Sequence, residues 1–446
     1  MRNQRKLIRF LLVSALLAVL IASAPVLASA KSWTGHGGSD PGIKFYVPKP
    51  NPGAIEQIFD LLRSHQWADA KLIGKMIGTP QAVWFTGGTP DSVKRDVRNI
   101  VRSAALFRTV PVLVAYNIPF RDCAQFSAGG ATSVAEYVAW IDGFAAGIGD
   151  KKAVVILEPD GLGIIPWYNP FADRDTWETN PNYEWCQPQL PGDVGPTPHP
   201  ELATDRFFML NYAVDALKAK PNVTVYLDGT HSAWLGAGDA ADRLYQAGVL
   251  DADGFFLNVS NYRLNSHLEK YGTWIAKCIW FGDPGSGSWG AGHFEWCASQ
   301  YSSPNGPVNP NDFSTWIYTD QWYTANVESQ TWVPYPGDAG LKKFVIDTSR
   351  NGQGPWTPPP YPDPQDWCNP PDRGVGLRPT ANTGIALLDA YLWVKIPGAS
   401  DGECTRGLGP AGTTVDPEWG LIDPAAGEWF PEMALDLVHN ANPPLQ

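Results

Sequence analysis

The chain has 446 residues, of which 17% are charged, and its formal net charge at pH 7 is −12. This length suits one large domain or two domains of ordinary size. Because the chain is acidic and has no basic cluster, we do not expect nucleic acids or anionic membranes as partners.

The first 30 residues have the pattern of a secretory signal peptide. Basic residues precede an apolar run from Phe10 to about Leu20, and the small residues Ala28–Ala30 supply a cleavage site. The apolar run is too short to span a membrane comfortably. We therefore expect a secreted, extracellular protein whose remaining residues, 31–446, form a single domain and a monomer.

Short β-rich runs alternate with amphipathic segments along the rest of the chain. The expected strands are 44–47, 81–85, 110–116, 153–157, 223–228, 254–259, 343–347 and 390–394. Helices are expected at 90–107 and 133–148, where apolar residues share one face, and Thr89 or Asp91 is expected to cap the first. This alternation predicts a parallel sheet, and seven or eight repeats predict an α/β fold, a distorted TIM-like barrel.

The run Ala153–Leu157 ends abruptly on Glu158, Pro159 and Asp160. Its apolar, partly β-branched residues predict a strand that is buried on both faces. Pro159 cannot continue the ladder, and an extended chain would point Glu158 and Asp160 to the same side. A carboxyl group at the end of an apolar strand is poorly solvated, which raises its pKa and suits a general acid. The alternative is that Asp160 only caps a following helix.

Polar clusters follow at least five of the expected strands. They are Arg121–Cys123, Glu158–Asp160, Asp228–His231, Asn258–Asn261 and Asp347–Arg350. In a parallel barrel these ends open on one rim, where active sites lie. Long excursions lie on the same rim, at 161–204, 263–323, 355–378 and 401–429, and structureless loops of such length are usually functional. The sequence therefore predicts a catalytic rim whose loops form a substrate groove or tunnel.

Six cysteines in an exported chain predict three disulfides and leave many pairings open. Cys278 and Cys297 lie within one excursion, which favours their pairing. No C-x-x-C or H-E-x-x-H pattern is present, so we expect neither a metal nor an organic cofactor. The chain has 20 tryptophans and 16 tyrosines, more than a core of this size requires. Packing in the core and loops accounts for most of these rings. In an exported protein the usual role of the surplus rings is to stack on sugars.

Seven motifs occur between about residue 80 and the C-terminus. They are Tyr116–Cys123, Leu157–Asp160, Tyr226–Trp234, Asn258–Tyr262, Asp347–Gly352, Asp366–Asn369 and Leu392–Lys395. Their residues and their order resemble glycoside hydrolase family 6, the inverting cellulases. The resemblance implies a single catalytic domain that hydrolyses the β-1,4-glucosidic bonds of cellulose or a related β-glucan with inversion. An endoglucanase is the first expectation, and a cellobiohydrolase is the alternative.

The resemblance also implies a role for each matching position. Asp160 is the expected general acid, Asp122 the carboxylate that helps to set its pKa, and Asp401 the proposed base. The alternative to Asp401 is a water chain that links Ser127 and Asp122. The positions expected to contact substrate are Tyr116, Ser127, Trp84, His231, Trp234, Asn258, Trp367 and Lys395. The disulfides implied by the resemblance are Cys123–Cys186 and Cys368–Cys404.

Two other classes of protein compete with an enzyme. A carbohydrate-binding protein that has lost catalysis would lack the acid or its partners, yet Asp122, Asp160 and Asp401 are all present. A structural wall protein should show internal repeats or an anchor, and we find neither pattern in the sequence. Ala399 and Ser400 stand where some members of family 6 place a substrate-binding glutamate before the aspartate, so the sequence departs from the family's pattern at that sugar contact.

Overall fold

The computed structural model describes residues 42–170 and 183–445. The expected signal peptide, residues 1–30, lies outside this part of the chain. Within the described residues, no helix has the length and apolar character needed to cross a membrane.

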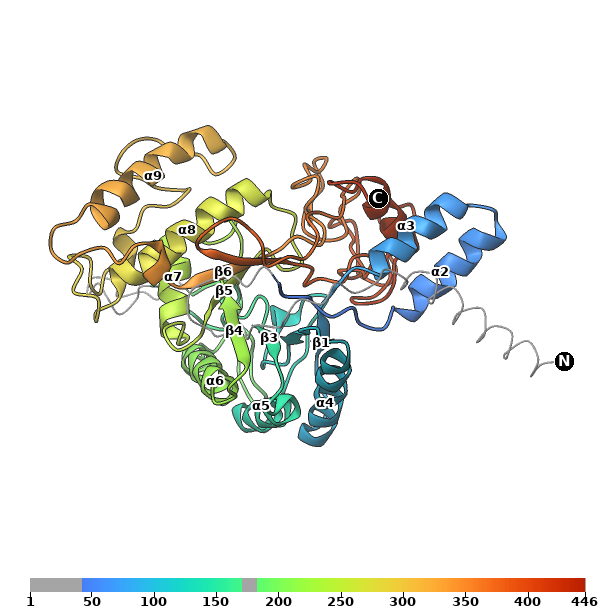
Figure 1. Cartoon of the computed structure of the whole chain (residues 1–446), viewed down its shortest axis with the longest axis horizontal. Coiled ribbons are helices and arrows are strands. Elements are labelled where there is room, and N and C mark those ends of the chain that lie inside the picture. Colours follow the sequence, from blue (N-terminus) through green and yellow to red (C-terminus); the bar gives the residue numbers. More distant parts are fainter. Residues whose placement is uncertain (1–41, 171–182, 446) are drawn as a thin grey trace. The chain divides into compact units, whose positions relative to one another are not determined.

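Seven parallel strands form one sheet in the order of the sequence, with helices around it (Figure 1). The strands are β1 (Val83–Phe85), β2 (Val112–Ala115), β3 (Ala153–Leu157), β4 (Val223–Asp228), β5 (Gly254–Leu257), β6 (Lys343–Asp347) and β7 (Leu388–Leu392). The sheet curls into a half-barrel. Its two edges approach each other, because Ala82 N before β1 donates to Trp393 O after β7 at 2.9 Å. The predicted distorted barrel of parallel strands is confirmed.

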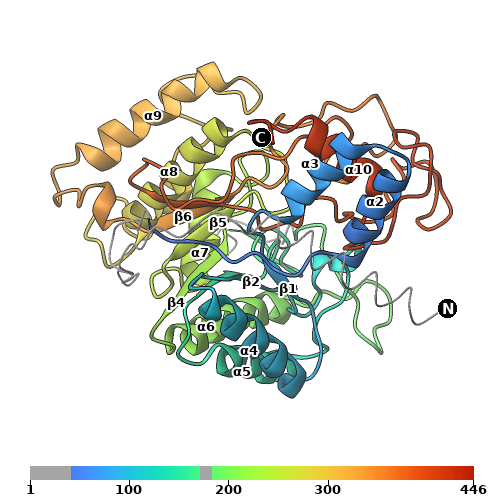
Figure 2. The ribbon, with the colours of Figure 1, turned by 45° about the vertical axis from the view of Figure 1, so that its right-hand side comes forward.

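Each of the first five connections between strands contains a long helix, as a parallel sheet requires. The α-helices of the described residues are α2 (Pro52–Arg63), α3 (Trp67–Ile77), α4 (Pro90–Leu106), α5 (Val134–Ile148), α6 (Glu201–Lys218), α7 (Ala237–Gln246), α8 (Asn265–Gly282), α9 (Ile317–Tyr323) and α10 (Pro431–His439). Helices α4, α5 and α6 lie together on one side of the sheet (Figure 2). Helices α2, α3 and α10 pack on one another through an apolar cluster of their own.

Helix α4 shows how the local sequence sets an element. The Thr89 hydroxyl caps it by accepting a hydrogen bond from Ser92 N at 3.2 Å, and Pro90 occupies the first turn. The apolar stripe that includes Val93, Val97 and Val101 is buried. The predicted helices at 90–107 and 133–148 are therefore confirmed to within a residue at each end.

Two element predictions are wrong. Residues 44–47 form no strand, because only Phe45 pairs with a neighbour, in a single parallel bridge to Val110. The excursion 263–323 is not structureless, since it contains the 18-residue helix α8 and the shorter α9. Most of α8 is buried, including its Gly272, where an added Cβ would lie 2.6 Å from the Phe344 ring of β6. The polar residues Ser266, Lys270, Thr273 and Lys277 are not buried and share one face of α8, so the helical period is present in the sequence.

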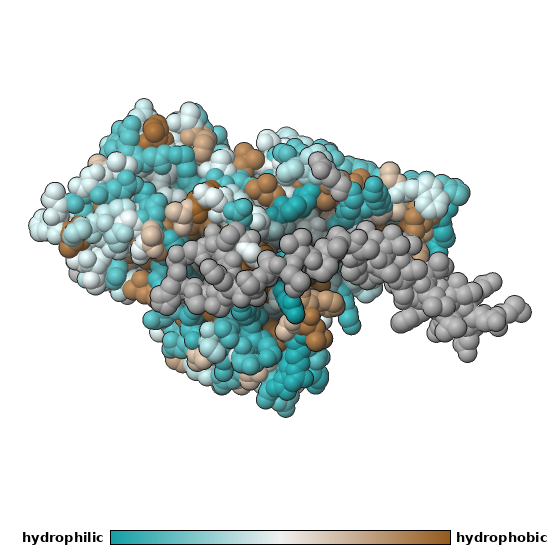
Figure 3. All heavy atoms as spheres, in the orientation of Figure 1, coloured by the Kyte–Doolittle hydropathy of each residue, from teal (hydrophilic) through white to brown (hydrophobic). Residues whose placement is uncertain are grey.

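Hydrophobic and hydrophilic residues are mixed on the face shown in Figure 3. Single exposed apolar residues are normal on a soluble surface. The described residues of this face form no broad apolar patch that would indicate a docking surface.

Candidate active site

A cavity of about 860 Å³ opens where the strands β1 to β7 end. It is lined by the predicted catalytic residues and by every predicted substrate-binding residue except Asn258. The lining therefore includes Asp122, Asp160, Asp401, Trp84, Tyr116, Ser127, His231, Trp234, Trp367 and Lys395. Segments far apart in the sequence thus meet at the carboxyl ends of parallel strands, where barrel enzymes hold their active sites.

Strand β3 ends in a tight turn rather than in an extended chain. The φ angles of Glu158 and Asp160 are +52° and +62°, so the prediction that their side chains point to the same side is wrong. Glu158 is fully buried, and its carboxylate accepts hydrogen bonds from Asn117 N and Ile118 N at 2.9–3.0 Å. Asp160 instead lines the cavity, and it caps no helix, because residues 161–170 form none.

Left-handed backbone conformations recur at the ends of the central strands. The non-glycine residues there with φ between +52° and +70° are Phe120, Asp122, Glu158, Asp160, Thr230, Asn258 and Ser260. Each such conformation costs about 1–3 kcal/mol and persists only where the surroundings enforce it. Their gathering at one end of the sheet indicates a functional constraint at the cavity.

The surroundings of Asp160 keep its carboxyl group protonated. Burial raises the pKa of Asp160 well above its usual range, and the negative charges of Asp228 and Asp122 raise it further. Asp228 is itself buried, which raises its pKa to about 6, and its carboxylate accepts hydrogen bonds from Leu162 N and Gly163 N at 3.2 and 3.3 Å. Like charges close together resist a second ionisation. Asp160 is therefore suited to donate a proton at neutral pH.

Asp122 lies in a turn that Arg121 fixes. Ser127 N donates to the Asp122 carboxylate at 2.7 Å. Arg121 in turn donates to Ser127 O at 2.8 Å and to Tyr116 O at 2.6 Å, and its guanidinium lies 4.5 Å from the centre of the Tyr116 ring. Burial raises the pKa of Asp122 to about 6, although the bond from Ser127 opposes the shift. A carboxylate with this pKa can accept a proton near neutral pH.

Asp401 is held in ionic contacts on both of its oxygens. Arg350, which is fully buried, donates to Oδ2 at 2.8 Å and to Oδ1 at 3.0 Å, and Lys395 Nζ lies 3.0 Å from Oδ1. Asn369 N and the Tyr262 hydroxyl add bonds to Oδ2 at 3.0 and 3.3 Å. Burial opposes ionisation, but the charges of Arg350 and Lys395 outweigh it and lower the pKa of Asp401 to about 2. Such a carboxylate is a weak proton acceptor.

Three tryptophan rings in the cavity have fixed orientations. Trp84 Nε1 donates to Val394 O at 2.8 Å, and its ring meets Tyr116 edge to face, with centroids 5.4 Å apart. The Trp234 ring lies so close to Gly163 that a Cβ there would come within 2.7 Å of it. Trp367 packs against Phe126, with centroids 5.9 Å apart. Fixed, partly exposed rings in a cavity are suited to stack on the apolar faces of sugars.

His231 and Asn258 follow β4 and β5, but only His231 reaches the cavity. Ala233 N donates to His231 Nδ1 at 3.2 Å, while burial and the Arg263 charge lower the His231 pKa well below its usual value. A neutral imidazole that accepts at Nδ1 carries its proton on Nε2, which leaves one hydrogen-bond donor.

The prediction that Asn258 binds a sugar hydroxyl needs correction, because its side chain is spent on the protein. Its amide donates to Asp347 O at 2.9 Å and to Asn261 O at 3.2 Å, and its oxygen accepts from Arg263 N at 3.0 Å. Asn258 is buried and lies outside the cavity lining. It fixes the turn after β5, and its side-chain amide already donates two hydrogen bonds within the protein.

Several residues of the site were missed from the sequence as individual candidates. Arg350 and Asp228 stand in motifs that the sequence points out, yet their roles depend on distant partners, Asp401 and Asp160. Trp185 and Arg263 also line the cavity, within long excursions where no periodic pattern marks a residue. For Trp185 the available signal is its position directly before a cysteine.

The loops around the cavity are tied down by covalent and ionic contacts. All three expected disulfides are present, joining Cys123 to Cys186, Cys278 to Cys297 and Cys368 to Cys404. Fully buried Arg406 pairs with Asp416 at 2.7 Å and donates to Cys368 O at 2.7 Å. These contacts hold the walls formed by residues 362–369 and 401–427 together.

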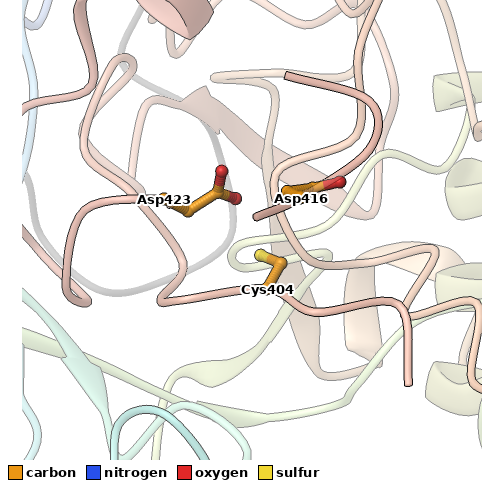
Figure 4. A group of neighbouring side chains, drawn as sticks. All are labelled: Cys404, Asp416 and Asp423. Carbon is orange, nitrogen blue, oxygen red and sulfur yellow. The ribbon is translucent and has the colours of Figure 1, made fainter. Parts of the chain in front are cut away.

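Asp416 and Asp423 meet beside Cys404 (Figure 4). Among the described residues this is the one grouping spaced to hold a metal ion, but the Cys404 sulfur is in a disulfide and Asp416 pairs with Arg406. We therefore assign no metal to it. Asp423 is buried, and one of its oxygens accepts from Asn369 at 2.8 Å while the other has no hydrogen-bond partner. Burial raises the pKa of Asp423 to about 7, and the charge of Asp416 adds to the shift.

We predict that Asp423→Asn changes how stability depends on pH. The unfolded chain ionises Asp423 near its ordinary value of 3.8, whereas the folded protein keeps it neutral up to about pH 7. The stabilisation from the neutral form is therefore lost as pH rises from about 4 to about 7. Asparagine mimics the neutral acid, so thermal unfolding should show the melting temperature of the variant, relative to the parent, rising across this window and then levelling off. A difference that stays constant from pH 4 to pH 8 would contradict a neutral Asp423.

Three comparisons with known proteins agree with one another. The family profile described as "Glycosyl hydrolases family 6" matches residues 41–441. Endoglucanase 1 of Streptomyces sp. (strain KSM-9) is 32% identical over 348 residues, which cover 76% of this chain and 70% of that protein. A probable 1,4-beta-D-glucan cellobiohydrolase C of Aspergillus terreus is 28% identical over 353 residues, which cover 74% of this chain and 59% of that protein.

Among solved structures, the endoglucanase Cel6 from Mycobacterium tuberculosis has a TM-score of 0.59 and 30% sequence identity to this chain. The match covers 90% of this chain and 97% of that one. That structure holds a thio-linked cellobioside derivative.

Proposed function

The chain belongs to glycosyl hydrolases family 6 and is a cellulase, a glycoside hydrolase of β-1,4-glucans, and from this we propose that it is an endoglucanase that acts with inversion. The observation that carries the proposal is the meeting of Asp160, Asp122 and Asp401 in one cavity with tryptophan rings. The endoglucanase assignment is supported by the names of the relatives at 29–32% identity.

In this proposal Asp160 is the general acid. The glycosidic oxygen of a bound glucan takes the proton of Asp160 as the bond to the anomeric carbon breaks. Burial and the nearby charges of Asp228 and Asp122 keep that proton in place until the substrate arrives. After the leaving chain departs, Asp160 regains a proton from solvent.

The attacking water loses its proton to Asp122 rather than to Asp401. Asp401 has a pKa lowered to about 2 and has both oxygens engaged by Arg350 and other donors, so it has little capacity to accept a proton. Asp122 has a pKa of about 6, and the backbone N–H of Ser127 donates a hydrogen bond to its carboxylate. An inverting site needs room for a water between acid and base, about 6.5–9.5 Å between carboxyl groups. In this proposal a water chain past Ser127 carries the proton to Asp122, so Asp122 need not touch the attacking water itself.

The glucan lies on the aromatic rings of the cavity. Trp84, Trp234 and Trp367 take successive glucose rings, and Tyr116 crowds the ring at the cleavage point toward a distorted conformer. His231 and Lys395 contact hydroxyl groups. Asp401 holds Lys395 and Arg350 in place, which gives it a positioning role.

The stereochemistry of the product tests inversion. Direct attack of water on a β-glucoside from the opposite face gives the α-anomer. Proton NMR of a cello-oligosaccharide digest in its first minutes should therefore show the α-anomeric signal of the new reducing end before mutarotation. A β signal appearing first would exclude inversion.

The cleavage pattern separates the two kinds of cellulase. An endoglucanase lowers the viscosity of carboxymethyl cellulose steeply for each reducing end released, because it cuts inside chains. A cellobiohydrolase, the alternative favoured by relatives such as the Aspergillus terreus protein, releases reducing ends with little loss of viscosity. We expect the first pattern, and the second would assign the chain to the alternative.

We further propose that residues 1–30 direct secretion and that residues 31–446 form one catalytic domain, which works as a monomer. The basic and apolar pattern of the first 30 residues and the three disulfides support export. N-terminal sequencing of the exported protein and its mass in solution by light scattering test these points.

A further inference from the structure

Trp185 differs from the other tryptophans of the cavity. Its side chain is 55% exposed although it lines the same cavity as Asp160 and Asp122, whereas Trp84, Trp234 and Trp367 are only partly exposed. A single exposed ring is normal on a surface, so exposure alone indicates nothing. The fixed backbone on both sides of Trp185 and its place in the cavity are the features that indicate a ligand.

Both neighbours of Trp185 are anchored in the core. Glu184 forms an ion pair with Arg243, a side chain that is 1% exposed, and Glu184 N donates to Tyr168 O at 2.9 Å. Cys186 is fully buried, is joined to Cys123, and accepts a hydrogen bond from Trp167 N at 2.8 Å. The backbone on either side of the exposed indole is therefore fixed, so little conformational freedom remains to be lost when the indole binds a ligand.

The same anchors set the position of Trp185 relative to the chemistry. Cys123 follows Asp122 directly, so the disulfide ties Trp185 to the turn that carries this carboxylate. Arg243, the partner of Glu184, also donates to Leu162 O at 2.9 Å, two residues beyond Asp160. A connected set of contacts therefore links Trp185 to the turns that carry Asp122 and Asp160.

We propose that Trp185 forms a further glucose-binding subsite of the cavity, in addition to those at Trp84, Trp234 and Trp367. Its ligand is a glucose ring of a longer β-1,4-glucan, which stacks its apolar C–H face on the indole. The inference rests on the proposed function and adds to it a preference for longer chains.

The test is the dependence of kcat/KM on substrate length in Trp185→Ala. Because a stacked ring contributes roughly 0.5–1.5 kcal/mol, the loss should be about 2- to 12-fold on cellohexaose and clearly smaller on cellotriose. Trp185→Phe should recover most of the loss, because it restores an aromatic face. Trp332→Ala is the matched control, because Trp332 is 75% exposed and lies outside the cavity lining.

The outcomes separate this subsite from the proposed function as a whole. If the parent enzyme hydrolyses cello-oligosaccharides but Trp185→Ala loses nothing, or loses the same factor at every length, the subsite is refuted. A lower melting temperature together with an equal loss at every length also refutes it, because that result marks a structural role. If the parent enzyme hydrolyses none of these substrates, the proposed function itself fails.

Discussion

Asp160→Ala is expected to lower kcat/KM on cellotetraose by about 10²- to 10⁴-fold, the range that a positioned general acid contributes. The leaving group is a sugar alkoxide, which departs poorly without a proton. Burial and the charges of Asp228 and Asp122 hold that proton on Asp160, and no other described carboxyl group of the cavity combines such a raised pKa with this position at the end of β3.

The matched control is Asp366→Ala. Asp366 also lines the cavity and pairs at 3.5 Å with Arg263, but it lies away from the β3 turn in sequence and is partly exposed. Initial rates should fall far less in this variant than in Asp160→Ala. Similar losses in the two variants would mean that the rate follows the total charge of the cavity and not one proton donor.

Asp401→Asn is expected to lose both stability and activity. The substitution leaves buried Arg350 without its carboxylate, and removing one partner of a buried ion pair costs about 3–5 kcal/mol. The lowered pKa of Asp401 makes the stability of the parent depend on pH. The ion pair contributes stability above about pH 4, and this contribution is lost as pH falls towards 2, the approximate pKa of Asp401 in the folded protein. Urea unfolding at pH 7 and pH 3 measures both points.

Azide distinguishes this positioning role from that of a direct base. If Asp401 itself took the proton from water, azide could take the place of water in Asp401→Asn, restoring the rate and yielding an α-glucosyl azide. We expect no rescue, because the loss arises from displaced Arg350 and Lys395. Adding Arg350→Met to Asp401→Asn should recover part of the stability without recovering activity, because it removes the unpaired charge. Rescue by azide in a variant of parental stability would restore Asp401 as the base.

The sequence was sufficient to predict the sheet and most of the cavity. Strand β3 is apolar throughout and is followed by Glu158, Pro159 and Asp160. In a parallel barrel the carboxyl ends of all strands lie on one rim. The alternation of strands and helices along the sequence therefore predicts that the residues following the strands meet in one cavity, even though their individual contacts are unknown.

Two features could not be predicted in this way. The direction of Glu158 depends on a left-handed φ at that residue, which an extended chain does not anticipate. The burial of Asn258 involves the acceptor Asp347 O at the end of β6, which only tertiary structure brings close to it. Helix α8, in contrast, carries a polar stripe of Ser266, Lys270, Thr273 and Lys277, so its helical period could have been predicted from the sequence.

The central claim is that Asp160 supplies the proton to the leaving oxygen, and its most direct test compares two substrates in Asp160→Ala. Fluoride departs without a proton, whereas the leaving sugar of cellotetraose requires one. The variant should therefore hydrolyse β-cellobiosyl fluoride within about tenfold of the parent rate while it loses about 10²- to 10⁴-fold on cellotetraose. An equal loss on both substrates, or no loss on cellotetraose, would contradict the assignment of Asp160 as the acid.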